Sequence, residues 1–400
     1  MLDNHLPVRT PAPPLEPVKP VERIPELDAL RGLALFGVLL AYALWNLGSP
    51  PEETYGQLDR ALNWTLLVLV DTKAYTTFAF LFGLGFSIQL SRALQRGSSI
   101  VPVYCRRLLA LLLIGLGHAL LLRNGDILVP YASMGFVLLL FRNASNRVLV
   151  LVAIAGYLTP DIVWGAWNLT GIPFPQRPET EGMSYFASNL AWVRYWYTTA
   201  ISFWPASLPM FMFGLYVGRR RLFEDIGAHR KGLRRVLFLG LGVGISVYLV
   251  RLLFFQTYPS APASFWGGLV LRLLWSVHAW GLAAFYASSL LLLWQRQKWQ
   301  RWLAPLAAVG RMALTNYLLQ SILIIPVCVA LELFDKVTPR VGLLLALSVW
   351  VIQVPLSIWW LKRFRFGPAE WVWRSLTYGS LQPMRVPDSQ LPLPVLEVTR

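Results

Sequence analysis

The sequence predicts an all-α protein: a polytopic transmembrane helical bundle of about ten spans, with both termini in the cytoplasm. Of its 400 residues, 56% are hydrophobic and only 14% are charged, whereas a soluble domain carries roughly a quarter of charged residues. A bilayer crossing needs about 20 mostly apolar residues, and several runs of that length lack Asp, Glu, Lys and Arg. These runs are 32–51, 74–91, 195–218, 312–331 and 341–361.

Taken in order, the apolar runs and the charges between them give ten crossings. The first follows the LDALRG start, the third and fourth flank the tight RNGD turn at 123–126, and the seventh follows a strongly basic connection. The connection 170–194, rich in Pro, Trp and Tyr, is expected to lie partly in the outer interface, where aromatic rings are favoured. The expected crossings are 30–48, 66–90, 105–122, 127–141, 148–168, 199–218, 236–255, 265–293, 303–330 and 341–361.

Most of the 36 Lys and Arg residues fall in alternate connections, and this asymmetry predicts the orientation. Because cytoplasmic loops carry the excess of basic residues, both termini are expected in the cytoplasm and the number of spans is expected to be even. The predicted location is the plasma membrane, with the lipid bilayer as a partner.

The net charge of +16 does not indicate nucleic acid, because the bases flank apolar runs and no basic segment is long enough to fold alone. The two cysteines imply no disulfide framework. Residues 1–25 are predicted to be a disordered Pro-rich arm and 381–400 a disordered tail. Between them we expect an N-terminal transmembrane half at 26–225 and a C-terminal half at 226–380. The late segment RFRFGPAEWVWRSLTYG mixes Arg with aromatic residues, which predicts a short helix on the membrane surface.

Ionisable groups inside membrane spans are costly and therefore informative. Asp28 and Arg31 are three residues apart, so they share one helical face at the entrance of the first span. The pair is compatible with an acid that complements the helix dipole and a cytoplasmic anchor. It is also compatible with an arginine that binds a phosphate or carboxylate.

Asp71 and Lys73 interrupt an apolar stretch from 62 to 90, which exceeds the bilayer thickness at about 1.5 Å per residue. The crossing is therefore expected to begin near Lys73, with the preceding turn at the outer interface. Lys73 is expected either to extend its ammonium group to the interface or to face an outer cavity. The glycines of the following FGLGF are expected to allow close helix packing.

His118 lies in the outer half of the third span, eight residues before Asp126. One interpretation is a hydrogen-bonded core histidine. The other is a general base, because a carboxylate at the same outer turn can orient the imidazole. On the second interpretation, His118 and Asp126 are the candidate catalytic residues.

Arg272 falls deep within the eighth run, where an arginine is not expected to face lipid. It is expected either to form an internal ion pair or to bind substrate. Asn316 and Gln320 share a helical face, where interhelical hydrogen bonding is the simpler role and substrate binding the alternative. The sequence contains no HExxH, CxxC, Walker or nucleophile-elbow motif, so it firmly implies no metal or cofactor.

Five stretches resemble the YeiB-like bacterial membrane proteins, whose C-terminal part is named domain of unknown function 418. They are LDALRGLALFGVLLAY, KAYTTFAFLFGLGFSIQL, GHALLLRNGDILVPYA, GRMALTNYLLQSI and FRFGPAEWVWRSLTYG, in order from 27 to 380. More distantly, the chain is similar to membrane acyltransferases, including the heparan-α-glucosaminide N-acetyltransferases and the sugar O-acyltransferases, which share an LDxxRG-type start. The resemblance implies a bacterial inner-membrane location and carries Asp28, Arg31 and Gly32 over to the entrance of the site.

Eleven residues after the arginine of this start, the O-acyltransferases have His, and the YeiB-like and N-acetyltransferase proteins have Asn. Eleven residues return to the same helical face about three turns deeper. Here the position is Tyr42, whose hydroxyl donates a hydrogen bond but is a poor base near neutral pH. The departure weakens the carry-over of chemistry through Tyr42 and leaves His118 as the best remaining base.

The first functional hypothesis is an integral-membrane acyltransferase-like enzyme. It moves an acyl group from a cytoplasmic thioester, with acyl-CoA as a compatible donor, to a hydroxyl or amine of a small-molecule acceptor. Arg31 lies near the donor phosphates, Asp126 orients the base His118, and Lys73 or Arg272 holds anionic groups. The second hypothesis is a transporter or exporter of a small anionic or amphipathic metabolite that uses the same charges. The third is a membrane scaffold, and a homo-oligomer is compatible with each.

Overall fold

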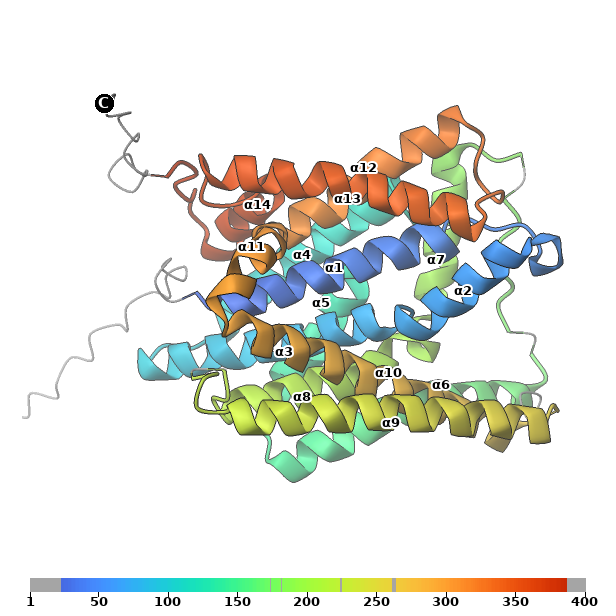
Figure 1. Cartoon of the computed structure of the whole chain (residues 1–400), viewed down its shortest axis with the longest axis horizontal. Coiled ribbons are helices and arrows are strands. Elements are labelled where there is room, and N and C mark those ends of the chain that lie inside the picture. Colours follow the sequence, from blue (N-terminus) through green and yellow to red (C-terminus); the bar gives the residue numbers. More distant parts are fainter. Residues whose placement is uncertain (1–22, 173, 181, 224, 261–263, 387–400) are drawn as a thin grey trace, which may run out of the picture.

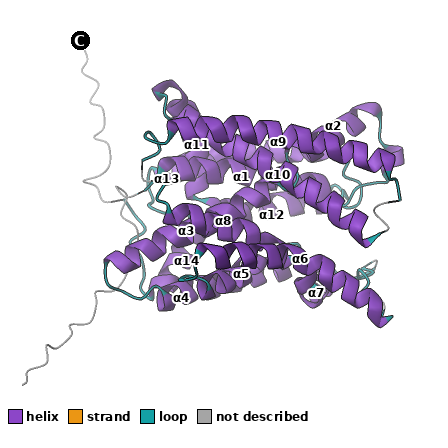
Figure 2. Cartoon of the chain, turned by 90° about the horizontal axis from the view of Figure 1, so that it is seen from below, coloured by secondary structure: helices purple, strands orange, loops and turns teal. Residues whose placement is uncertain are grey.

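The computed structural model describes residues 23–172, 174–180, 182–223, 225–260 and 264–386. In this part of the chain it consists of helices, their connections and one isolated β-bridge between Phe364 and Arg385. Most helices run along the long axis of the molecule (Figure 1), and Figure 2 shows that the loops gather at its two ends. The predicted all-α bundle is confirmed. The predicted N-terminal arm and C-terminal tail lie largely outside the described residues.

Fourteen α-helices form within the described residues. They are α1 (Pro25–Trp45), α2 (Gln57–Leu69), α3 (Lys73–Gln95), α4 (Val101–Leu121), α5 (Leu128–Leu140), α6 (Asn146–Thr170), α7 (Tyr185–Thr198), α8 (Leu208–Arg219), α9 (Arg230–Thr257), α10 (Phe265–Trp294), α11 (Gln297–Arg311), α12 (Ala313–Ala330), α13 (Pro339–Leu361) and α14 (Pro368–Tyr378). Three short 3-10 helices accompany them at Glu52–Thr54, Ala200–Ser202 and Trp204–Ser207.

Nine helical stretches of the described chain are long and apolar enough to cross a membrane. The expected crossing at 127–141 is α5, which has only 13 residues and is shorter than the roughly 20 that a full crossing needs. The expected crossing at 303–330 is divided between α11 and α12 at Met312, and only α12 is among the nine. A multi-pass membrane protein is the result, with nine candidate spans in place of about ten.

The first and last helices of the described chain meet at one end of the bundle. The start of α1 and the whole of α14 lie there, whereas α7 lies across the opposite end (Figure 1). We name these the basic end and the aromatic end, after the side chains described below. The basic end is the one that the charge asymmetry of the sequence predicts to be cytoplasmic.

Glycine on both partners allows three helix pairs to pack backbone against backbone. A Cβ on Gly310 of α11 would lie 1.8 Å from the Asp28 carbonyl oxygen of α1. Helices α3 and α8 pack equally closely, because a Cβ on Gly83 would lie 2.0 Å from the Phe211 carbonyl oxygen. In α9 and α10, a Cβ on Gly240 would lie 2.7 Å from a carbonyl oxygen of α10. Small residues at such contacts are the usual device of membrane bundles, and Gly83 belongs to the FGLGF stretch expected to serve it.

A break separates α2 from α3 directly before Lys73. Both helices together form one candidate span from Gln57 to Gln95, interrupted at Thr72, whose φ of 65° is left-handed. Lys73 is the first residue of α3 and is only 2% exposed, so its ammonium group does not extend to the surface of the bundle. Its ammonium instead donates to the Leu67 carbonyl at 3.3 Å, one of the carbonyls left free where α2 ends.

Candidate functional site

His118 lies on α4 and is held between two partners inside the bundle. Its Nδ1 lies 2.8 Å from Asp126 Oδ1, and its Nε2 lies 2.9 Å from the Ser321 hydroxyl on α12. The side chains of His118 and Asp126 are 1% and 2% exposed. A carboxylate oxygen only accepts hydrogen bonds, so Nδ1 carries a proton, and in the corresponding neutral tautomer Nε2 accepts from Ser321.

Asp126 reaches back to His118 because the chain turns tightly between α4 and α5. The amide of Arg123 bonds to the His118 carbonyl at 2.8 Å, which ends α4 just before the turn. Gly115 lies beneath the carboxylate, where a Cβ would come within 2.9 Å of an Asp126 oxygen. Asp126 Oδ2 also accepts from the Val129 amide at 2.9 Å. The first turn of α5 therefore fixes the carboxylate that faces His118.

Tyr42 lies beside this pair. The Arg123 guanidinium lies over its ring, 3.8 Å from the centroid, and Ser321 is among its near neighbours. Tyr42 itself is 2% exposed. The position eleven residues after Arg31 therefore lies next to His118, Asp126 and Ser321, and we name these four residues the His118 cluster.

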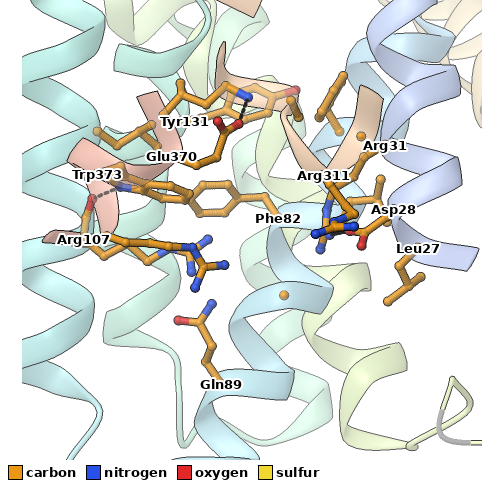
Figure 3. A pocket seen from close by; sticks show the side chains of 18 of the residues that line it. Leu27, Asp28, Arg31, Phe82, Gln89, Arg107, Tyr131, Arg311, Glu370 and Trp373 are labelled. Carbon is orange, nitrogen blue, oxygen red and sulfur yellow. Dashed lines mark hydrogen bonds and ion pairs between the residues drawn. The ribbon is translucent and has the colours of Figure 1, made fainter. Parts of the chain in front are cut away.

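A cavity of about 330 Å³ opens at the basic end between α1, α3, α4, α11 and α14. Asp28 and Glu370 are the carboxylates among its described lining residues, and Asp28 is paired with Arg31. Arg107 on one wall and Arg311 on the opposite wall extend toward the same space (Figure 3). Six arginines line this basic cavity: Arg23, Arg31, Arg92, Arg107, Arg311 and Arg374.

The described lining of the basic cavity holds more arginines than carboxylates. The Nε atoms of Arg107 and Arg374 are buried without a hydrogen-bond partner among the described residues. Burial, together with the nearby Arg311, lowers the pKa of Arg23 to about 10, so Arg23 remains protonated at neutral pH. Because free guanidinium N–H groups match carboxylate and phosphate oxygens, the basic cavity fits a polyanionic ligand.

The segment predicted as a short surface helix forms α14 and one wall of the basic cavity. Glu370 accepts from the Leu314 and Thr315 amides at 2.6 and 3.1 Å and from the Thr315 hydroxyl. Burial raises the pKa of Glu370, and the hydrogen bonds from Thr315 oppose that rise. Trp373 donates its indole N–H to the Arg107 carbonyl at 2.9 Å. Helix α14 thus joins the start of α12 to α4.

The deep end of the basic cavity is mostly apolar and reaches the His118 cluster at Tyr317. Tyr317 lines the cavity, and its hydroxyl donates to Asp126 Oδ1 at 3.1 Å and accepts from the Ile127 amide at 3.2 Å. Its ring centroid lies 5.0 Å from that of His118. One aromatic ring therefore separates the basic cavity from the imidazole.

A second cavity, of about 220 Å³, opens at the aromatic end. Asp126 lines it, so the carboxylate that orients His118 borders on this aromatic cavity. The indole N–H of Trp196 is buried without a hydrogen-bond partner in the described part of the chain. None of the described lining residues is Lys or Arg, and four are aromatic: Trp196, Tyr197, Phe203 and Trp204.

Lys73 and Arg272, predicted to hold anionic groups of a substrate, line neither cavity. Lys73 lies 4.4 Å from the Trp275 ring centroid. Arg272 forms an ion pair with Asp161 and donates to the Tyr157 carbonyl at 2.7 Å. Both cations are therefore satisfied between helices, away from His118.

Asn316 and Gln320 also lie outside both cavities. Asn316 donates to the Ser357 hydroxyl of α13 at 2.9 Å. Gln320 lies 3.5 Å from Gln353 of α13 and from the Leu35 carbonyl of α1. The two amides join α12 to its neighbours, which is the simpler of the two roles expected for them.

Two family profiles match the chain. "Protein of unknown function (DUF418)" matches residues 217–380, and "Heparan-alpha-glucosaminide N-acetyltransferase, catalytic" matches residues 23–168. The chain is 33% identical to "Uncharacterized protein YxaH" of Bacillus subtilis (strain 168), over 92% of this chain and 98% of that protein. This protein belongs to the YeiB-like family. The YeiB-like relatives also include "Uncharacterized protein YeiB" of Escherichia coli (strain K12), which is 28% identical over 91% of this chain and 98% of its own length.

The site of this YeiB-like protein combines residues from both matched regions. Asp28, Arg31, His118 and Asp126 fall in the N-acetyltransferase match, whereas Ser321 falls in the DUF418 match. Sequence reasoning missed Ser321, because 203 residues separate it from His118. It also missed four residues of the basic cavity on α4 and α14, namely Arg107, Glu370, Trp373 and Arg374. For the residues of α14, the available signal was the mixture of Arg and Trp in the late segment.

Proposed function

We propose that this YeiB-like protein is a membrane acyltransferase that takes an acyl group from a phosphate-bearing thioester in the basic cavity. The observation that carries the proposal is the position of the His118–Asp126 pair between a cavity rich in arginine and a cavity rich in aromatic residues. The match of residues 23–168 to an acetyltransferase catalytic region supports the same reaction class.

The donor is a molecule whose phosphates and reactive carbon are far apart. Arg31 lies at the mouth, and Tyr42 beside His118 follows eleven residues later, about 16 Å along the helix at about 1.5 Å per residue. A thioester of coenzyme A combines phosphates with a long flexible arm, so it fits an arginine-lined mouth with an apolar deep end. The acyl carbon reaches His118 when the Tyr317 ring moves aside.

The acceptor is an amine that enters the aromatic cavity. Aromatic faces beside a carboxylate attract an ammonium group, and Asp126 supplies the carboxylate. The Asn46 and Asn124 side chains each donate one N–H, to the Ala41 carbonyl and to Asn189 Oδ1, and their oxygens can accept from an N–H donor. A hydroxyl acceptor satisfies the oxygens but makes no use of the ring faces.

In the overall reaction a bond forms between the acceptor nitrogen and the acyl carbon, the carbon–sulfur bond breaks, and the nitrogen loses a proton while the thiolate gains one. His118 is the base that carries protons during the reaction, and Asp126 stabilises the imidazolium that forms in between. The products are an amide and a free thiol.

The test is thiol release from acetyl-CoA by the purified protein in nanodiscs, with a series of primary amines as acceptors. We expect amine-dependent release that His118→Gln abolishes and that His229→Gln, at an exposed position, leaves intact. Release that proceeds unchanged in His118→Gln would disprove the proposed base.

An exporter is the second candidate, favoured by the break between α2 and α3. Interrupted helices at membrane depth commonly mark binding sites in transporters. Substrate flux in reconstituted vesicles without any covalent product would favour export over acyl transfer.

A further inference from the structure

We propose that Ser321 is the nucleophile of the reaction, so that the acyl group passes through an ester on its Oγ atom. The inference rests on the proposed acyl transfer and specifies its route. It is carried by the linear arrangement Asp126, His118, Ser321, with 2.8 Å from carboxylate to Nδ1 and 2.9 Å from Nε2 to hydroxyl.

The arrangement is that of a serine activated by a histidine and an acid, which is recognised by geometry and not by order in the chain. Three donors hold Asp126: His118 Nδ1, the Tyr317 hydroxyl and the Val129 amide. A carboxylate fixed at both oxygens keeps the histidine in the tautomer whose Nε2 lone pair faces Ser321. A histidine that served packing alone would not require this orientation.

A phenol and a cation lie near Ser321. Tyr42 is a near neighbour of Ser321, and the Arg123 guanidinium lies over the Tyr42 ring, 3.8 Å from the centroid. When Ser321 attacks, negative charge develops on the carbonyl oxygen of the thioester, and preorganised donors stabilise that charge. The Tyr42 hydroxyl is the candidate donor.

The position of Ser321 also suits a group that must be handed from one cavity to the other. Tyr317, one helical turn before Ser321 on α12, lines the basic cavity, and Asp126 lines the aromatic cavity. Ser321 itself is 1% exposed. An acyl group on Ser321 is therefore protected from bulk water until an acceptor arrives.

The acyl group is transferred in two steps. In the first, Ser321 Oγ bonds to the thioester carbon, its proton moves to His118 Nε2, the carbon–sulfur bond breaks, and the thiolate leaves with that proton as a thiol. In the second, the amine nitrogen bonds to the ester carbon, its proton moves to His118, and the carbon–oxygen bond breaks. Ser321 Oγ regains the proton, and the amide is released.

Intact-mass spectrometry after incubation with acetyl-CoA, without acceptor, tests the proposal. We expect one added acetyl group on the wild-type chain, none on Ser321→Ala or Asp126→Asn, and an unchanged adduct on Ser288→Ala, whose serine is buried on α10. In Ser321→Cys the adduct becomes a thioester, which neutral hydroxylamine removes while sparing the oxygen ester of the wild type. This variant keeps a nucleophile and tests the position even where Ser321→Ala fails to fold.

The outcomes separate this inference from the proposed function. Wild-type protein that transfers acetyl to amines, with Ser321→Ala doing so at the same rate, overturns the serine nucleophile and leaves acyl transfer standing. Absence of both adduct and transfer in the wild type overturns both. An adduct that maps to another residue overturns the assignment to Ser321.

Discussion

The imidazole of His118 and the carboxylate of Asp126 meet at 2.8 Å, eight residues apart on the two sides of one tight turn. The carboxylate also accepts from the first turn of α5, so the turn fixes its direction. Both side chains lie between the two cavities.

Asp126→Asn should reduce amine-dependent thiol release by about 10²- to 10⁴-fold, because an amide can donate to Nδ1 and so stabilise the wrong tautomer of His118. Initial rates with acetyl-CoA measure the loss. Asp225→Asn, near the exposed His229, is the matched control and should retain activity. Full activity in Asp126→Asn would show that the pair has no catalytic role.

Arg107→Ala should weaken the binding of coenzyme A by about tenfold or more, because a charge-assisted hydrogen bond contributes about 1.5 to 3 kcal/mol. Titration calorimetry in nanodiscs gives the dissociation constant. Arg301→Ala, on the exposed side of α11 and outside the cavity, should bind as the wild type does. Equal affinities for the two variants would mean that the basic cavity is not the donor site.

Gly85→Leu should fill the basic cavity without disturbing the fold. Gly85 lines the cavity, and a Cβ there would meet no atom within 4 Å. We expect coenzyme A affinity to fall while the thermal unfolding temperature stays within a few degrees of the wild type. Gly117→Leu on α4, which is equally free of neighbours but lines neither cavity, should change neither quantity.

Arg272→Met should destabilise the bundle by about 1 to 3 kcal/mol, because it leaves the Asp161 carboxylate without its partner. Adding Asp161→Leu should recover most of that loss, as expected for an ion pair that serves structure. Thermal unfolding in detergent measures both variants. Loss of coenzyme A binding in the double variant would instead indicate that Arg272 contributes to ligand binding.

Glu370→Ala should lower stability by about 1 to 3 kcal/mol, since the Leu314 and Thr315 amides lose their acceptor. Glu370→Gln keeps an acceptor oxygen and should lose less. Burial raises the pKa of Glu370 above its ordinary value of 4.5. The wild type should therefore lose stability relative to Glu370→Gln as the pH rises from the ordinary pKa through the raised pKa of the folded protein. Unfolding curves between about pH 4 and pH 8 check the sign, which a lowered pKa would reverse.

The sequence was a good guide to the helices, because a lipid-facing helix must be apolar over its whole length. Asp71 and Lys73 marked the break at Thr72, where a turn before Lys73 was expected. The sequence was a poor guide to the division at Met312, because Arg311 alone did not indicate that the expected crossing at 303–330 divides there. The partner of Arg272 was within reach of sequence reasoning, since Asp161 is an acid inside the expected crossing at 148–168.

The candidate site could be predicted only in part. His118 and Asp126 are close in the chain, so their meeting followed from one turn. Ser321, Tyr317 and Glu370 reach the site only through the packing of α12 and α14 against α4, and no local spacing encodes that contact. Lys73 was predicted to bind substrate but lines neither cavity. An ionisable side chain in a span can instead donate to the carbonyls of a broken helix, as Lys73 does.

The Tyr317 ring has a bioenergetic consequence. A bundle with a cavity at each end would let ions cross the membrane down their electrochemical gradient if the two cavities were connected. With the phenol hydrogen-bonded to Asp126, the two cavities share no lining residue among those described. We therefore expect the Tyr317 ring to limit ion leakage, even though the proposed chemistry carries a small group from one face of the membrane to the other.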